Sequence, residues 1–345
     1  MKRIVFMIAL MGVFAFATTN AMADELREQA KGAFEVIPAT PKVLPNNPAT
    51  PEKVELGKML FFEPRLSKSM LISCNTCHNL SFGGDDYQET SIGHGWQKGP
   101  RNAPTVLNSV YNHTQFWDGR AGDLAEQAKG PIQASVEMAA TPQHVVKVLK
   151  SIPEYVALFK KAFPKQKDPV TFDNMALAIE VFEATLVTPN SRFDKWLSGD
   201  DKAMNKEEKE GLRVFLEKGC DSCHGGINFT AEGFFPFGVE VAPSDEILAG
   251  DKGRAALKET DGEEGFKSPT LRNIVYTAPY FHSGKIWKLD EAVSIMSSSQ
   301  LGIKLSNKEV KQIVAFLKTL TGEQPKVEYP ILPPSTDATP KPVYH

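Results

Sequence analysis

Cys74-Asn-Thr-Cys77-His78 and Cys220-Asp-Ser-Cys223-His224 are two copies of one short motif, and together they contain all four cysteines of the 345-residue chain. Two thiols one helical turn apart can form thioethers with the two vinyl groups of a haem, while the adjacent histidine reaches the iron from the same side. The motif therefore predicts two covalently bound c-type haems, with His78 and His224 each supplying one iron ligand. No cysteine remains for a structural disulfide.

The N-terminus has the three parts of an export signal. Lys2 and Arg3 form a positive region, residues 4–16 form an apolar region, and Ala21-Met-Ala23 forms a cleavage site just before Asp24. We therefore expect a signal peptide at 1–23, cleaved after Ala23. No later stretch approaches the roughly 20 continuous apolar residues of a membrane span, so none is expected in the mature protein. The predicted compartment is a bacterial periplasm, which suits c-type haem because the cofactor is attached after export.

Paired cysteines also occur in zinc sites and in redox-active dithiols. A zinc site would need further Cys or His ligands clustered nearby, and a thioredoxin-like dithiol would need a βαβ context. Neither pattern is apparent in the sequence. Two copies of the motif behind an export signal therefore favour a dihaem protein.

The two halves of the chain resemble each other beyond the haem motifs. The stretch 104–111 aligns with 269–276, and 57–61 upstream of the first motif matches 211–215 upstream of the second. The chain is therefore predicted to be a duplicated cytochrome module. The copies differ where Trp117 of the first is replaced by His282 of the second, which indicates that the two modules have different functions.

The pattern of apolar residues is mainly helical. Residues 172–187 and 306–320 carry apolar side chains at helical spacing, and Ser306 with Glu309 forms a capping box at the start of the second stretch. The glycine- and proline-rich stretches at 83–104 and 229–243 are expected to be long loops rather than strands.

These features predict an all-α fold of two cytochrome c-like domains with one covalently bound haem each. The expected boundaries are 24–190 for the N-terminal domain, 191–325 for the C-terminal domain and 326–345 for an extended tail. About 320 residues remain after cleavage of the signal, which suits two domains of ordinary size. The net charge is −3 and no basic run stands out, so nothing indicates nucleic-acid binding.

The chain also resembles a known family over nearly its whole mature length. The matching blocks are Leu56-Gly-Lys58, Ser73-Cys-Asn-Thr-Cys-His78, Arg101-Asn-Ala-Pro-Thr105, Phe116-Trp-Asp-Gly-Arg120, Thr188-Pro-Asn-Ser-Arg-Phe-Asp194, Tyr280-Phe-His-Ser-Gly284 and Ala315-Phe-Leu-Lys-Thr-Leu-Thr-Gly322. On these blocks it is similar to the bacterial dihaem cytochrome c peroxidases. The resemblance implies reduction of hydrogen peroxide to water with electrons from a small c-type cytochrome or similar donor. It also implies a homodimer.

The resemblance implies three residues on the open side of the first, low-potential haem. His94 would be a distal ligand that is displaced when the other haem is reduced, which opens the iron to peroxide. Glu137 and Gln127 would form the distal polar pair, with the carboxylate moving the proton during O–O cleavage. From the residues alone, His94 is equally consistent with a surface loop, and Glu137 with a solvated position on a helix.

For the second haem, Met296 matches the family's distal methionine, although a helical Met alone would more often fill a core. His/Met ligation gives a high potential, as expected of a haem that receives electrons first. Related dihaem enzymes that oxidise protein-bound tryptophans have tyrosine at this position, so Met296 argues against their activity. Trp117 matches the tryptophan between the two haems, and it would relay electrons or simply pack in the domain interface. The sequence assigns no role to His282, which falls near the second haem.

The family resemblance also implies one Ca²⁺ ion between the domains. Its expected ligands are the side chain of Asn102 and the carbonyls of Thr277 and Pro279, a set that suits the flexible oxygen coordination of calcium. The main alternative function is a dihaem electron-transfer protein with little peroxidase activity, in which His94 stays bound permanently. Every haem-binding residue would be the same in that protein.

Overall fold

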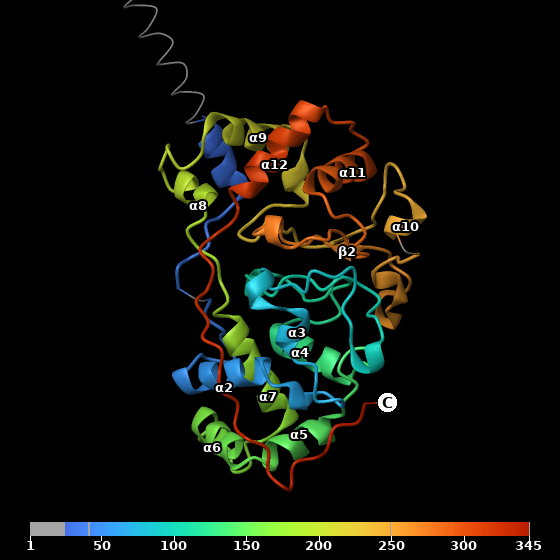
Figure 1. Cartoon of the computed structure of the whole chain (residues 1–345). Coiled ribbons are helices and arrows are strands. Elements are labelled where there is room, and N and C mark those ends of the chain that lie inside the picture. The colour runs from blue at the N-terminus through green and yellow to red at the C-terminus, as the bar shows by residue number, and fades with distance from the viewer. Residues whose placement is uncertain (1–24, 41, 249, 345) are drawn as a thin grey trace, which may run out of the picture.

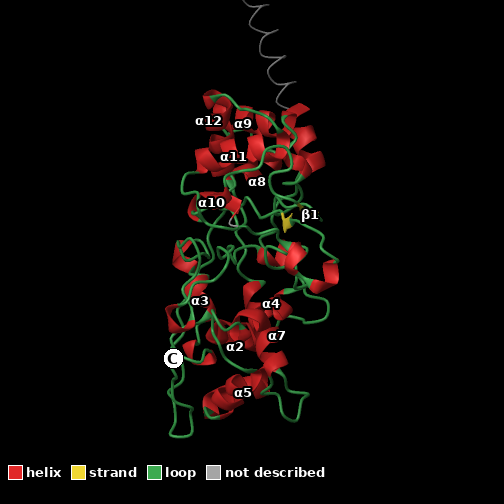
Figure 2. Ribbon diagram, turned by 90° about the vertical axis from the view of Figure 1, so that its right-hand side faces the viewer, coloured by secondary structure: helices red, strands yellow, loops and turns green. Residues whose placement is uncertain are grey.

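The computed structural model describes residues 25–40, 42–248 and 250–344, so the predicted signal peptide lies outside the described part of the chain (Figure 1). The fold is rich in helix, and the helices gather in two groups at opposite ends of the molecule with long loops between them (Figure 2). Within the described residues, no helix is both long enough and apolar enough to cross a membrane.

The helices of the first group are α2 (Pro51–Phe61), α3 (Cys74–Cys77), α4 (Leu124–Gln133), α5 (Pro142–Lys150), α6 (Pro153–Ala162) and α7 (Phe172–Glu183). Those of the second group are α8 (Arg192–Leu197), α9 (Lys206–Glu217), α10 (Asp245–Leu248), α11 (Leu289–Leu301) and α12 (Asn307–Lys318). Two strands, β1 (Phe234–Phe235) and β2 (Phe266–Lys267), pair antiparallel with Phe234 opposite Lys267. The expectation of a strand-free loop at 229–243 is therefore wrong, because its aromatic pair finds a partner more than 30 residues further along the chain.

Helix α12 begins as the sequence predicts. The Ser306 hydroxyl accepts the N–H of Glu309, and the Glu309 carboxylate accepts the N–H of Ser306. Helix α7 ends at Glu183, four residues before the predicted end. The Thr185 hydroxyl donates to the Phe182 carbonyl at 2.7 Å, and this local bond competes with continuation of the helix.

The predicted internal repeat is confirmed by equivalent packing in the two groups. Helix α2 packs on α7 where a Cβ at Gly57 would lie 1.9 Å from the Ala178 carbonyl oxygen, and α9 packs on α12 where a Cβ at Gly211 would lie 1.9 Å from the Gln312 carbonyl oxygen. The absence of a side chain lets each pair of helices approach closely. Each pair therefore forms the frame of one module.

The N-terminal segment of the described chain packs on the C-terminal module, and the C-terminal tail packs on the first module. Leu26 and Phe34 pack in the apolar core of the C-terminal module, and the Phe34 ring stacks on Phe229 with centroids 4.4 Å apart. This differs from the prediction that residues from 24 onward belong to the first domain, because these aromatic contacts draw the N-terminal segment to the other core. The described tail residues 326–344 contain no helix or strand. They run along the first module (Figure 1), where the Tyr329 ring packs against Phe62 with centroids 4.9 Å apart.

Candidate functional site

The second haem motif presents its histidine as a preorganised metal ligand. The Nδ1 atom of His224 lies 3.2 Å from the Phe229 carbonyl and 3.1 Å from the Ser268 hydroxyl. A carbonyl only accepts, so Nδ1 carries the proton and Nε2 keeps its lone pair for a metal. Burial lowers the pKa of His224 to about 4, which keeps the ring neutral at pH 7.

A largely apolar cavity adjoins this histidine. Its walls include Cys220, Cys223, His224 and Met296, so the structure brings together all four residues predicted to hold the second haem. Burial raises the pKa of the Cys220 thiol to about 12, whereas a reactive dithiol needs a thiol with a lowered pKa. Partly buried thiols, a neutral imidazole and a thioether around one apolar cavity fit a covalently bound haem.

The histidine of the first motif also has a lowered pKa. Burial lowers the pKa of His78 more than the charge of Asp86 and the carbonyls of Gly84 and Pro104 raise it, and its Nδ1 has no hydrogen-bond partner among the described residues. The carbonyls of Phe229 and Pro269 have the same effect on His224. Both motif histidines are therefore held neutral, as iron ligation requires.

The structure brings His94 and Glu137 together. The backbone N–H of His94 donates to the Glu137 carbonyl at 2.7 Å, and a Cβ at Gly93 would lie 2.0 Å from the Val136 carbonyl oxygen. Only 5% of His94 is exposed, so the alternative of a surface loop residue is wrong. The loop continues through Gly95 at φ 64°, a conformation that glycine adopts without strain.

Glu137 lies in the turn that follows α4, and its side chain is only partly exposed. The alternative of a solvated helix residue is therefore wrong. Burial raises the pKa of the Glu137 carboxyl, and the positive charge of Arg120 opposes this rise. Gln127 lies half-buried on α4, the helix that leads to this turn. A carboxyl with a raised pKa in a sheltered place is a candidate for proton transfer.

Trp117 lies where the two modules meet. Its indole Nε1–H donates to the Asn102 carbonyl at 2.9 Å, and the Asn102 N–H donates to the His282 carbonyl at 2.7 Å. The carbonyl of Trp117 itself accepts the N–H of Lys267 at 2.7 Å. Trp117 also lines the cavity that contains His224, so it connects the first module to the second haem site.

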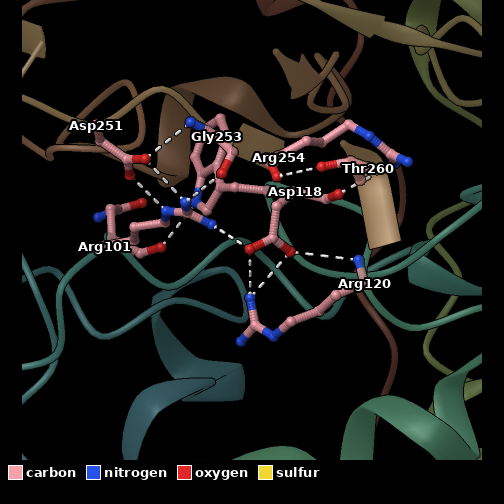
Figure 3. A network of polar contacts seen from close by, with 9 residues as sticks. Arg101, Asp118, Arg120, Asp251, Gly253, Arg254 and Thr260 are labelled. Atoms are coloured by element: carbon pink, nitrogen blue, oxygen red, sulfur yellow. Dashed lines mark hydrogen bonds and ion pairs between the residues drawn. The ribbon is translucent and has the colours of Figure 1, made fainter. Parts of the chain in front are cut away.

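A network of charged residues joins the modules beside Trp117 (Figure 3). Arg101 contacts Asp251 at 2.5 Å and Asp118 at 2.6 Å, and Arg120 contacts the same Asp118 at 2.9 Å. The positive charge of Arg120 also lowers the pKa of Glu137. The network therefore connects a loop of the second module to the carboxyl group of Glu137. Sequence reasoning missed this network, since no local pattern relates Asp251 to Arg101.

The three predicted calcium ligands lie around the same interdomain cavity as Trp117. The Nδ2 atom of Asn102 donates to the Gln88 carbonyl at 3.0 Å, which leaves Oδ1 as the end of the amide that can bind a cation. With the carbonyls of Thr277 and Pro279, this gives the oxygen donors that calcium prefers. These residues therefore fit the ion.

His282 is a buried histidine with partners of its own. Its Nε2 lies 2.9 Å from the Leu248 carbonyl, and its ring stacks on Phe266 with centroids 4.3 Å apart. The ring also lies 6.3 Å from Trp117. These contacts make His282 part of the wall between the two modules.

Comparison with known proteins identifies the class. The family model described as di-haem cytochrome c peroxidase matches residues 51–202. The chain belongs to this family and is an oxidoreductase acting on peroxide, as its relatives named cytochrome c551 peroxidase indicate. It is 56% identical to cytochrome c551 peroxidase of Pseudomonas aeruginosa over 96% of both chains, and 51% identical to cytochrome c551 peroxidase of Nitrosomonas europaea over 89% of this chain and 92% of that one.

More distant relatives have other names. The methylamine utilization protein MauG of Methylorubrum extorquens is 34% identical over 95% of this chain and 96% of its own. A solved structure of a MauG-like protein associated with microbial copper homeostasis is 28% identical, with a TM-score of 0.73 over 84% of this chain and 94% of that one. The two-module fold is therefore shared by proteins with different biological settings.

Proposed function

We propose that this protein reduces hydrogen peroxide to water in the periplasm, with electrons from a small c-type cytochrome. The reaction consumes two electrons and two protons for each peroxide and releases two water molecules. The observation that carries the proposal is the contact between the His94 loop and the Glu137 turn. In support, a backbone hydrogen bond joins the buried residue His94 to Glu137, whose carboxyl group has a raised pKa, in the module that contains the first haem motif.

Each module of this chain supplies the residues to hold one haem. Cys74, Cys77 and His78 would hold the first, and the equivalent residues of the second motif would hold the other together with Met296. When bound, the haems supply the redox chemistry, which is electron uptake at one centre and transfer of two electrons to peroxide at the other.

The proton chemistry belongs to Glu137. Its carboxylate would accept a proton from one peroxide oxygen and return it to the other, so that the second oxygen leaves as water. Gln127 would orient the peroxide by hydrogen bonding. His94 would cover this site in the resting protein and swing away after reduction of the second haem, a movement that the neighbouring Gly93 and Gly95 would permit.

Two interdomain features would support electron transfer. Trp117 would carry electrons between the modules, since hydrogen bonds hold both its indole and its backbone in the interface. Asn102, Thr277 and Pro279 would hold one Ca²⁺ ion in the same region and fix the two modules relative to each other. We further propose export by the N-terminal signal and assembly as a homodimer.

The decisive experiment measures peroxide-dependent oxidation of a reduced small c-type cytochrome, with the protein as isolated and after one-electron pre-reduction. Activity only after pre-reduction would support displacement of His94. Activity in both states would mean that the first site is open at rest. Absence of activity in both states, with two haems bound and several donors tried, would favour the electron-transfer alternative.

A further inference from the structure

Lys267 is a buried cation whose position is unusual. It belongs to β2, the residue is only 7% exposed, and it lines the cavity that contains His224 and Met296. Its backbone N–H donates to the Trp117 carbonyl at 2.7 Å. The next residue, Ser268, donates to the Cys223 carbonyl at 2.6 Å and contacts the ring of His224. Lys267 is thus held between the interdomain tryptophan and the second haem motif.

Among the residues that the structure describes, none supplies a counter-charge to the ammonium group of Lys267. Among the described residues, no carboxylate forms an ion pair with it and no acceptor forms a hydrogen bond with Nζ. Asp85 is the one acidic side chain among the described residues that line the cavity, and its carboxylate accepts the backbone N–H groups of Asp86 and Tyr87. Burial alone lowers the pKa of Lys267, to about 8, and no neighbouring charge opposes this shift. A buried ammonium without a partner is strongly unfavourable, so an anion in the cavity would stabilise it.

The internal repeat shows that the backbone does not require a lysine here. Extending the alignment of 104–111 with 269–276 places Asn102 opposite Lys267, and the two residues donate equivalent 2.7 Å backbone bonds to His282 and Trp117. The same backbone position is occupied by a neutral amide in the first module. The hydrogen bonding of the backbone therefore does not account for the positive charge of Lys267.

We propose that the Lys267 ammonium is the counter-charge for a propionate carboxylate of the second haem and raises that haem's reduction potential. The inference rests on the proposed second haem site, and a haem carries two propionates as its anionic groups. Pairing with a cation neutralises one negative charge near the iron, which favours the reduced form. Lys267 is thus a positioning residue that adjusts the reduction potential of the second haem, where electrons would arrive.

The test is a potentiometric titration of both haems in three variants of the full-length holoprotein. Lys267→Met removes the charge but keeps the length of the side chain, and it should lower the midpoint potential of the second haem while leaving the first unchanged. Lys267→Arg should restore most of the potential. Lys252→Met is the matched control, because Lys252 is 67% exposed and pairs with Glu264, and it should change neither midpoint.

An unchanged second midpoint in Lys267→Met, with two haems bound by the pyridine haemochrome assay, would overturn the proposal. If that variant does not fold, a crystal structure of the parent holoprotein decides. Nζ should lie within about 3.2 Å of a haem carboxylate oxygen, whereas an ammonium directed to a backbone carbonyl or to solvent would refute the pairing. Neither measurement depends on peroxide turnover, so failure of the peroxidase assignment would be seen separately.

Discussion

Replacement of Glu137 by glutamine tests the proposed proton transfer directly. The amide has nearly the shape of the carboxyl group but cannot accept a proton at neutral pH. A positioned general acid or base contributes roughly 10²–10⁴-fold to a rate, which is about 2.7–5.4 kcal/mol of activation free energy. We expect kcat to fall within this range, because burial raises the pKa of Glu137 toward the working pH, where a general base is most effective.

The assay is peroxide-dependent oxidation of a reduced cytochrome, with the haem content of each variant measured in parallel. Glu126→Gln is the matched control. It makes the same chemical change at an exposed residue of α4, whose carboxylate accepts the Gly122 N–H at 2.7 Å. The control should keep its activity within about twofold. Turnover of Glu137→Gln within the same limits, with two haems bound, would refute the assigned role.

The pH profile gives the prediction a second readout. The carboxyl group must be ionised to accept a proton, so activity should fall as the pH drops through the raised pKa of Glu137. The residual activity of Glu137→Gln should lack this acidic limb. The charge of Arg120 lowers the pKa of Glu137, so Arg120→Gln should shift the limb to higher pH. A limb that stays in place would show that another group controls it.

Three further changes test the second haem and the frame. Met296→His should lower the midpoint potential of the second haem and slow reductive activation, and an identical potentiometric titration would argue against ligation by Met296. Arg272→Met leaves Asp194 buried without the two 3.0 Å contacts of its guanidinium partner, so the free energy of unfolding should fall by about 3–5 kcal/mol in denaturant titrations; a loss below about 1 kcal/mol would contradict this. Gly57→Ala places a Cβ 1.9 Å from the Ala178 carbonyl and should lower stability by about 1–3 kcal/mol, whereas an unchanged melting temperature would contradict the close helix contact.

The features that the sequence predicted well are local or periodic. The cysteine motifs, the capping box at Ser306 and the repeat each depend on residues a fixed distance apart along the chain, so a single sequence records them. The approach of Met296 to His224 could be expected only from the family resemblance. The structure places both at one cavity, more than 70 residues apart in sequence.

The features that were missed depend on contacts between distant segments without a regular pattern. Phe34 packs on Phe229, and Arg101 contacts Asp251, through loops whose course no periodicity describes. The pairing of β1 with β2 arises in the same way, because two-residue strands carry too few residues to show alternation. Lys267 could be recognised as unusual only when its burial was known.

The repeat also explains how two similar modules can perform different tasks. Asn108 and Asn273 occupy equivalent positions, and both donate to the hydroxyl of Thr188, which lies in the segment between the modules. The modules are thus arranged about a common point, as in a two-fold symmetric pair, where equivalent residues meet near the axis.

Trp117 and His282 are equivalent residues in this arrangement, and their rings lie 6.3 Å apart. The symmetry of the frame brings these two positions together. Because their side chains differ, the two sides of the interface are not equivalent, and this gives electron transfer a direction. An indole on one side can relay electrons, and a histidine held by the Leu248 carbonyl on the other side fills the wall. Exchange of the two side chains, Trp117→His with His282→Trp, should therefore leave the fold intact but slow electron transfer between the haems. Equal rates of transfer between the haems in the parent and the exchanged variant would show that the direction comes from the haems alone.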